Sequence, residues 1–324
     1  MIMRRVILSG LLSLIGVPAL VSAQSTRAAG KIGYLHTATI SSTNYALLIM
    51  RPIWQQLGYV EGETVLLRSG ESDPQRLSAI VTELISLEVG VLLVVGPAAV
   101  KAARQTTTTQ PIVAIDLETD PVRSRLIASF GRPGSNVTGL FMDQASLTGK
   151  WFELLREIAP SIERIALVWD PNTGPDQLDA AKAAAFRIGI ETLVLEVRST
   201  EGYEAAFKSL GSERRTGIVQ LGSPALVNPP ARFGDVALKY GLPTISFQKN
   251  LAMAGTLMAY GPDLESYFPR AVILADKILK GAKPSELPIE RPDRFQLIIN
   301  RKTAKALGIE IPALLLARAD EVLE

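Results

Sequence analysis

From residue 30 onward the sequence alternates short apolar runs with longer stretches of helical periodicity. Short runs rich in Val and Ile and bounded by Gly, Pro, Asp or Asn predict strands. They are Ile32–Leu35, Thr64–Leu67, Val91–Val95, Ile112–Leu117, Val137–Phe141, Ile165–Trp169, Thr192–Val197, Gly217–Leu221, Thr244–Phe247 and Thr256–Ala259. Apolar residues at helical spacing predict helices over Asp73–Val89, Ser146–Ile158, Asp176–Ile188, Thr200–Leu210 and Asp263–Leu279. Such alternation implies parallel sheets with right-handed crossovers, so the predicted fold class is α/β.

The length and one turn-rich segment predict two units. A domain holds roughly 100–200 residues, and the chain has 324. Phe130–Asn136 interrupts the alternation near the middle of the chain, and its Pro133-Gly134 pair fits the centre of a type II turn. The alternation resumes at Ser146. We therefore predict two lobes, and the alternative is a surface loop within one domain.

The first 23 residues predict a cleaved secretory signal peptide. Arg4 and Arg5 form a basic start, Val6–Val21 carries no charge, and Val21-Ser22-Ala23 provides the small residues that signal peptidase recognises. The apolar run has 16 residues, whereas a helix needs roughly 20 to span a bilayer. We expect cleavage after Ala23 and a periplasmic location. The alternative is an uncleaved N-terminal anchor.

The composition argues against several kinds of chemistry. The chain has 34 Lys and Arg against 32 Asp and Glu, and loss of Arg4 and Arg5 with the signal peptide balances the two. The chain therefore has no excess of positive charge that would attract it to nucleic acid. It has no Cys, which excludes disulfides, thiolate metal sites, Cys nucleophiles and a Cys-linked lipid. The single His rules out a metal site built from several His, and we expect neither a metal nor a cofactor.

Small and polar residues follow most of the predicted strands, where ligands bind in open α/β sheets. Their hydroxyl, amide and carboxylate groups suit hydrogen bonds to a small ligand and form no nucleophile, base and orienter set. The candidate ligand-binding residues are His36, Thr37, Asn44, Gly96, Pro97, Ala98, Glu118, Thr119, Asp120, Asn172, Ser223, Phe247 and Gln248. Each has a structural alternative, because Ser, Thr, Asp and Asn commonly cap helices.

Three of these candidates carry titratable groups. His36 is interpreted as a ligand contact, a neutral polar group at a strand end, or a base. Glu118 is placed to meet a ligand ammonium group. Asp120 precedes Pro121 and a predicted helix start, so a helix cap is the alternative to an acid–base role. Apolar contact area comes from Tyr34, Phe141 and Phe247, each of which is equally a core residue.

The chain resembles a known family through an ordered set of segments that runs from about residue 30 to the end. They are Lys31–Leu35, Leu57–Gly62, Gly96–Ala99, Pro111–Val113, Asp120–Val122, Arg132–Gly139, Leu154–Glu157, Tyr260–Leu264, Ile278–Pro284, Leu297–Asn300, Lys302–Gly308 and Leu315–Val322. Together they are similar to the periplasmic ABC-transporter substrate-binding proteins, whose characterised members bind tryptophan or related small molecules. The chain departs from the family where Thr119 replaces a frequent Gly and where Ser246-Phe247-Gln248 replaces a Tyr-Pro-Trp-like stretch.

The resemblance implies a type I periplasmic binding protein fold, with two doubly wound parallel-sheet lobes joined by a multi-strand hinge. The N-terminal lobe is then expected at residues 24–138 plus 262–290, and the C-terminal lobe with the hinge at 139–261 plus 291–324. Asn136–Gly139 would be the first crossing between lobes and Tyr260–Asp263 the return. The Phe295–Asn300 strand would brace the hinge.

The expected function is that of a receptor rather than an enzyme. It would close on a small molecule, such as an aromatic or branched amino acid or carboxylate, and deliver it to an ABC permease in the inner membrane. We expect a monomer with no nucleic-acid partner. The alternatives are an exported sensory receptor that docks a signalling protein, and a periplasmic enzyme using His36, Glu118 or Asp120.

Overall fold

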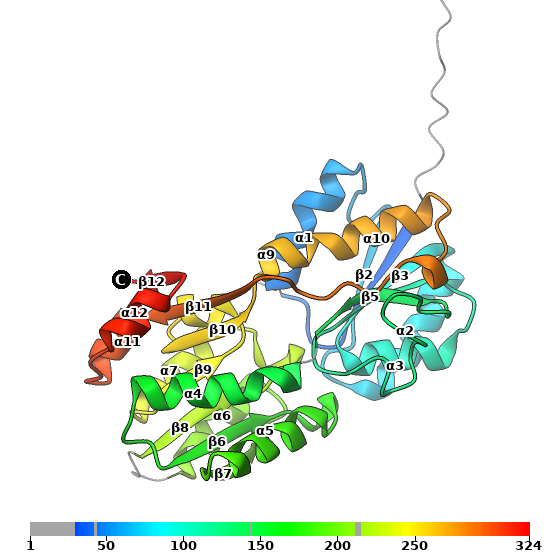
Figure 1. Cartoon of the computed structure of the whole chain (residues 1–324). Coiled ribbons are helices and arrows are strands. Elements are labelled where there is room, and N and C mark those ends of the chain that lie inside the picture. The colour runs from blue at the N-terminus through cyan, green and yellow to red at the C-terminus, as the bar shows by residue number, and fades with distance from the viewer. Residues whose placement is uncertain (1–29, 42–43, 143, 211–214) are drawn as a thin grey trace, which may run out of the picture.

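The computed structural model describes residues 30–41, 44–142, 144–210 and 215–324. The predicted signal peptide lies outside these residues. The chain forms two α/β lobes that lie next to each other, each built on its own sheet (Figure 1). None of the described helices is both long and apolar enough to cross a membrane.

The first lobe contains a five-stranded sheet in the order β2-β1-β3-β4-β5, with every neighbouring pair parallel. Its strands are β1 Lys31–His36, β2 Val65–Ser69, β3 Val89–Val95, β4 Ile112–Asp116 and β5 Val137–Phe141. Its helices are α1 Tyr45–Gln56, α2 Pro74–Ser86, α3 Pro97–Thr106, α9 Leu264–Tyr267 and α10 Pro269–Leu279. Apolar residues of α1 and α10 cover one face of the sheet, and those of α2 and α3 cover the other.

The second lobe contains a seven-stranded sheet in the order β12-β11-β10-β9-β8-β6-β7. Its strands are β6 Arg164–Trp169, β7 Glu191–Glu196, β8 Thr216–Gln220, β9 Thr244–Ser246, β10 Met258–Pro262, β11 Phe295–Asn300 and β12 Glu321–Leu323. Its helices are α4 Thr148–Ile158, α5 Asp176–Arg187, α6 Tyr203–Lys208, α7 Ala231–Lys239, α8 Lys249–Met253, α11 Arg301–Ala306 and α12 Ala313–Arg318. Apolar residues of α4 and α5 cover one face, and those of α6 and α7 cover the other.

The predicted α/β class with two doubly wound lobes is confirmed, and the structure refines it in two places. The ten predicted strands correspond to β1–β10, with ends that move by at most three residues. β11 runs antiparallel to β10, so the second sheet is mixed rather than wholly parallel. The single helix predicted over Asp263–Leu279 is two helices, because α10 begins at Pro269, which has no N–H to continue a preceding helix.

The chain passes between the lobes after β5, after β10 and before β11 (Figure 1). β5 stays paired with β4 up to the Asp116–Phe141 partners, so the chain leaves the first sheet after Phe141 rather than at the predicted boundary after Thr138. Glu290 bridges to Leu140 on the first sheet shortly before β11 enters the second. The Tyr267 hydroxyl donates to Phe141 O at 3.1 Å and Glu290 O at 2.7 Å, which ties two of these connections together.

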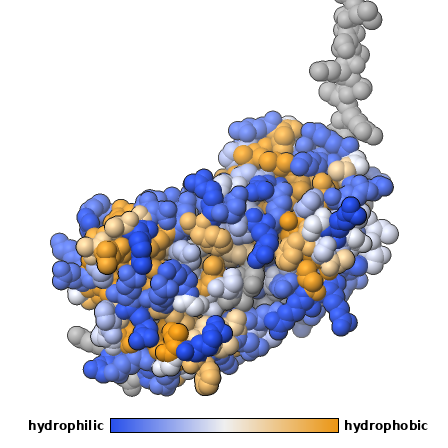
Figure 2. Space-filling view, viewed as in Figure 1, coloured by the Kyte–Doolittle hydropathy of each residue, from blue (hydrophilic) through white to orange (hydrophobic). Residues whose placement is uncertain are grey.

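Hydrophilic side chains predominate on the face shown in Figure 2, and hydrophobic ones gather in separate patches over both lobes. The larger apolar side chains are mostly inside, and the biggest fully buried ones include Trp54, Trp151, Tyr34 and Tyr203. One apolar cluster runs through both lobes. Apolar side chains therefore fill the region between the lobes. Because this packing is close, one lobe cannot move without changing its contacts with the other.

Candidate ligand-binding cleft

The two lobes meet around a small space of about 40 Å³. Its first-lobe wall includes His36, Asn44 and Glu118, and its second-lobe wall includes Asn228 and Gln248. These residues follow the carboxyl ends of strands or begin helices, which is where a parallel sheet presents its ligand site. Only a few water-sized groups fit in such a volume. The structure therefore describes a closed arrangement of the lobes, and we call this space the interlobe cavity.

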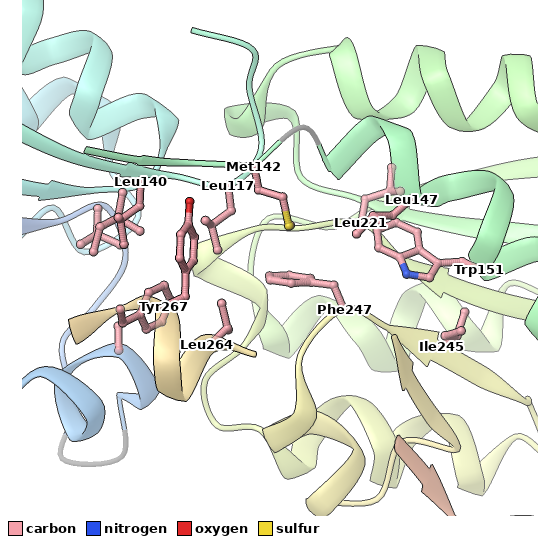
Figure 3. Packing of buried hydrophobic residues seen from close by; sticks show 14 of the residues in the cluster. Leu117, Leu140, Met142, Leu147, Trp151, Leu221, Ile245, Phe247, Leu264 and Tyr267 are labelled. Atoms are coloured by element: carbon pink, nitrogen blue, oxygen red, sulfur yellow. The ribbon is translucent and has the colours of Figure 1, made fainter. Parts of the chain in front are cut away.

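Apolar side chains from both lobes pack together where the lobes meet (Figure 3). Phe247 follows β9 of the second lobe and lies between Met142 and Leu264, on two of the connections between lobes. Leu117 reaches the same region from the end of β4. Leu117 and Phe247 also line the cavity, so a ligand there would meet an apolar surface on both sides.

Asn44 and His36 form a rigid neutral pair at the cavity. Asn44 caps α1, because its Oδ1 accepts from Leu47 N at 3.1 Å. This cap directs Asn44 Nδ2 toward His36 Nε2 at 3.4 Å. His36 Nδ1 lies 3.1 Å from both Ala38 O and Ala38 N, so the tautomer decides whether it donates to the carbonyl or accepts from the amide. Burial lowers the pKa of His36 to about 4, so its ring is neutral at pH 7.

Two carboxylates at the end of β4 have different surroundings. Asp116 accepts from Glu118 N at 3.1 Å and from both Thr119 N at 2.9 Å and Thr119 Oγ1 at 2.5 Å. Asp116 therefore shapes the loop that carries Glu118. The Glu118 carboxylate accepts from Leu117 N at 3.0 Å and lines the interlobe cavity.

Burial raises the pKa of Asp116 and raises the pKa of Glu118 further. Glu118 is only 5% exposed, and the negative charge of Asp116 adds to the effect of burial on it. The pKa of Glu118 rises to about 8. Glu118 is thus largely protonated at pH 7 in the described closed conformation.

The corresponding strand end of the second lobe is internally bonded. Asp170 follows β6 and accepts from Asn172 N at 3.0 Å and from Ser223 Oγ at 2.6 Å. Nearby, Gly222 N donates at 2.8 Å to both Gln144 Oε1 and Gln177 Oε1. Burial raises the pKa of Asp170, and the bond from Ser223 opposes that rise. These groups hold the loops after β6 and β8 together.

Two side-chain carbonyl oxygens at the cavity lack partners. Asn228 Oδ1 and Gln248 Oε1 are buried and have no hydrogen-bond partner among the described residues. A buried acceptor without a donor costs about 1–3 kcal/mol. Both residues belong to the second lobe, so this lobe brings two amide groups with unpartnered carbonyl oxygens to the wall of the cavity.

A second, wider hollow of about 760 Å³ lies on the other side of the β4 end. It is lined by α3, by the loop with Asp116 and Thr119, and by the turn at Pro171–Thr173 of the second lobe. Lys101, Arg104 and Arg125 also line it. Asp116 and Glu118 therefore face different spaces, although only one residue separates them.

The structure brings together about half of the residues predicted to bind ligand. His36, Asn44, Gly96, Glu118, Phe247 and Gln248 line the interlobe cavity. Pro97, Ala98, Thr119 and Asn172 line the wider hollow. Thr37, Asp120 and Ser223 line neither space.

Each of the three remaining residues has a structural partner. Thr37 Oγ1 donates to Val95 O at 2.9 Å. Asp120 Oδ1 accepts from Val122 N at 2.8 Å and Arg123 N at 3.1 Å, so it caps a turn, and the helix start predicted after it is absent from the described residues. Ser223 Oγ donates to Asp170 and accepts from Ala225 N at 3.1 Å.

Sequence reasoning missed two polar cavity residues, Tyr45 and Asn228. Tyr45 opens α1, a helix that the apolar pattern did not predict and that carries Pro52 in its interior. Asn228 follows the short helical turn Pro224–Leu226 after β8, several residues beyond the strand end. In the sequence, Asn228 precedes two prolines. This pattern predicts a turn, but it does not show that the turn places Asn228 at the cavity.

Among the described residues, no group of three or more His, Cys, Asp or Glu is arranged to hold a metal ion. No Lys or Arg of the described residues lines the interlobe cavity. The cavity therefore combines an apolar floor, one carboxyl group, neutral amide carbonyls and a neutral His. This arrangement suits binding of a small ligand rather than bond-breaking chemistry.

Comparison with known proteins gives consistent matches over most of the chain. A family model described as ABC transporter substrate binding protein matches residues 53–323. A tyrosine-binding protein of Clostridioides difficile (strain R20291) is 24% identical over 257 residues, which are 78% of this chain and 73% of that protein.

Two solved structures share the fold. A conserved domain protein from Vibrio cholerae has a TM-score of 0.80 at 22% identity, covering 91% of this chain and 99% of that one. The ABC domain in complex with L-Trp from Streptococcus pneumonia has a TM-score of 0.78 at 20% identity, covering 90% and 100% of the two chains.

Proposed function

The chain belongs to the ABC transporter substrate-binding protein family, and we propose that it is an exported receptor for an apolar amino acid, which it delivers to an ABC permease. The family consists of substrate-binding receptors rather than enzymes. The observation that carries the proposal is the interlobe cavity, whose walls come from both lobes. Because the described space holds only a few water-sized groups, the lobes would part to admit such a ligand and then close around it, with contacts from both sides.

The ligand class is supported by the lining of the cavity. Leu117, Phe247 and Phe268 give it an apolar surface suited to an aromatic or branched side chain. The polar groups of an amino acid have complementary partners there, since α1 begins at the cavity with Tyr45 and Ala46 in its first turn. The N-terminus of a helix favours a carboxylate. The relatives that bind tyrosine and tryptophan support the same class.

The remaining parts of the proposal concern location and organisation. Residues 1–23 would direct export to the periplasm, and the mature protein would act as a monomer. The two sheets and the three connections between them support a division into two lobes that close by hinge motion. A permease of the inner membrane would then recognise the closed form.

A panel of amino acids tests the proposed function. The mature protein is titrated with L-tryptophan, L-tyrosine, L-phenylalanine, L-leucine, L-isoleucine and L-valine while its thermal unfolding is followed. At 100 times its dissociation constant, a true ligand adds about 2.7 kcal/mol to the free energy of unfolding. At least one of the six is expected to do so, and glucose serves as the control. Stabilisation by none of them would contradict the proposal.

A further inference from the structure

Three residues that line the interlobe cavity carry acceptor oxygens with hydrogen-bonding capacity to spare. Glu118 contributes a carboxyl group from the first lobe, and Asn228 Oδ1 and Gln248 Oε1 are unpartnered carbonyls from the second. The neutral His36 ring adds no charge to the cavity. Buried acceptors without partners are satisfied by a ligand that donates several hydrogen bonds.

We propose that this acceptor set receives the ammonium group of the ligand, with Glu118 as its counter-ion from one lobe and the Asn228 and Gln248 carbonyls from the other. This assignment of the ammonium position rests on the proposed function, and it restricts the proposed ligand to compounds that carry an amine. An ammonium group has three donors and one positive charge. Its three N–H bonds then have one acceptor in the first lobe and two in the second, so the full set forms only when the lobes close.

The neighbouring carboxylates already accept hydrogen bonds from other groups of the protein. Asp116 accepts three hydrogen bonds from its own loop and faces the wider hollow. Asp170 accepts from Ser223 and Asn172 within the second lobe. Glu118 has one such bond, from Leu117 N. Among these three carboxylates, Glu118 is the one that lines the cavity and has acceptor capacity to spare.

Ligand capture at this position releases a proton. In the described closed conformation, burial and the charge of Asp116 favour the protonated form of Glu118 and raise its pKa to about 8. When the ammonium enters, Glu118 loses its proton to solvent and the resulting carboxylate pairs with the ligand cation. Binding to this conformation at pH 7 therefore releases a proton from Glu118, and the release declines as the pH rises through 8.

Four other titratable side chains of the described residues lie around Glu118, and two of them raise its pKa. From β1, the His36 ring is neutral at pH 7. From α1, burial and then Glu265 raise the pKa of Tyr45, which is therefore uncharged. Asp116 and Asp170 both raise the pKa of Glu118 by their negative charge. Lys101, Arg104 and Arg125 line the hollow on the far side of the β4 end.

Two ligand series test the assignment by calorimetry. The tryptophan series is L-tryptophan, tryptamine, which lacks the carboxylate, and indole-3-propionate, which lacks the amine. The leucine series is L-leucine, 3-methylbutylamine and 4-methylpentanoate. In the series that binds, we expect the acid to bind at least 100-fold more weakly than the amino acid. Titrations at pH 7 in two buffers of different ionisation enthalpy should show a net release of protons when the amino acid binds.

The Glu118→Gln variant separates this assignment from the general function. It should lower the affinity for the amino acid at least tenfold and reduce the proton release to near zero. Glu191→Gln, at an exposed position at the start of β7, is the matched control and should change neither. Thermal unfolding of both variants checks that they are folded.

The possible failures are distinguishable. An acid that binds as tightly as its amino acid, or proton release that persists in Glu118→Gln, overturns the ammonium assignment and leaves the receptor function standing. No binding of any compound in either series or in the larger panel overturns the receptor function, and the assignment falls with it.

Discussion

The ends of β4 in the first lobe and β6 in the second lobe each carry a buried aspartate, Asp116 and Asp170. Both aspartates accept backbone N–H bonds from the loop that follows. The first-lobe loop then adds Glu118, which faces the interlobe cavity. The second-lobe loop adds no such carboxylate, and its Asp170 is bonded instead to Ser223.

Because of this difference, the two lobes offer different chemical groups to a ligand. The first lobe supplies a carboxyl group that burial keeps largely protonated at pH 7, whereas the second supplies neutral carbonyls that remain unpartnered. Neither wall is satisfied alone in the closed state. A ligand cation satisfies both walls together, so its binding energy favours closure.

The largest expected effect concerns the contact between the two walls. Gly96 begins α3 with φ +94°, and a Cβ there would lie 2.6 Å from Thr37 Oγ1 and 2.9 Å from Pro224 Cγ across the cleft. Gly96→Ala should therefore oppose closure and lower ligand affinity at least tenfold. Affinity is measured by calorimetry with the amino acid that binds the wild type most tightly.

Gly62→Ala is the matched control for this substitution. Gly62 also has a positive φ, of +88°, but no atom lies within 4 Å of the position its Cβ would occupy. Both variants carry the backbone strain of about 1–3 kcal/mol expected for a non-glycine residue in an unfavourable conformation. Equal loss of affinity in both would show that strain, rather than contact between the lobes, is responsible.

The sequence allowed much of the fold to be predicted, because buried parallel strands are continuous Val- and Ile-rich runs. β5, for example, was predicted with its final bounds, Val137–Phe141. α1 was missed because its amphipathic pattern is interrupted by Pro52. The antiparallel direction of β11 depends on where the chain returns between the lobes, which local pattern does not reveal.

The candidate site was harder to predict than the fold. Residues directly after a strand were easy to select, but consecutive residues there face different spaces, as Glu118 and Thr119 show. The sequence also does not show which side chains are hydrogen-bonded to each other. It therefore predicts Ser223 as a ligand contact, although the Ser223 hydroxyl is bonded to Asp170. Asn228 was missed because its position depends on how the two lobes meet.

An intermediate effect is expected on the stability of the protein without ligand. The folded-state pKa of Glu118 lies above its usual value. Its contribution to stability is therefore fully present below that usual value and is lost as the pH rises to about 8. Glu118→Gln has no charge to bury and should be more stable than the wild type by about 1–3 kcal/mol at pH 8.5.

Denaturant unfolding at pH 5 and pH 8.5 measures this effect. The difference between Glu118→Gln and the wild type should be small at pH 5 and larger at pH 8.5. A variant that is less stable than the wild type at pH 8.5 would mean that the Glu118 carboxylate is already compensated in the folded protein, and the proposed contrast between the lobes would not hold.

The smallest effect concerns the second lobe. Ser223→Ala removes the hydroxyl that donates to Asp170 and accepts from Ala225 N. The free energy of unfolding should fall by about 1–2 kcal/mol, because a buried carboxylate oxygen loses its donor. Ligand affinity should change less than twofold, as measured by calorimetry.

Ser209→Ala is the control for the loss of a hydroxyl, since Ser209 Oγ donates to Ala206 O at an exposed position. Its free energy of unfolding should change by less than about 0.5 kcal/mol. A tenfold loss of affinity in Ser223→Ala would instead place Ser223 in contact with the ligand and give the second lobe a direct polar role beyond its carbonyls.

A crystal structure of the protein with its bound amino acid tests the division between the lobes most directly. We predict that the ligand nitrogen lies within about 3 Å of the Glu118 carboxylate and of a carbonyl oxygen from Asn228 or Gln248. A ligand whose carboxylate faces Glu118, or one bound in the hollow beside α3 with these acceptors still unpartnered, would contradict the account.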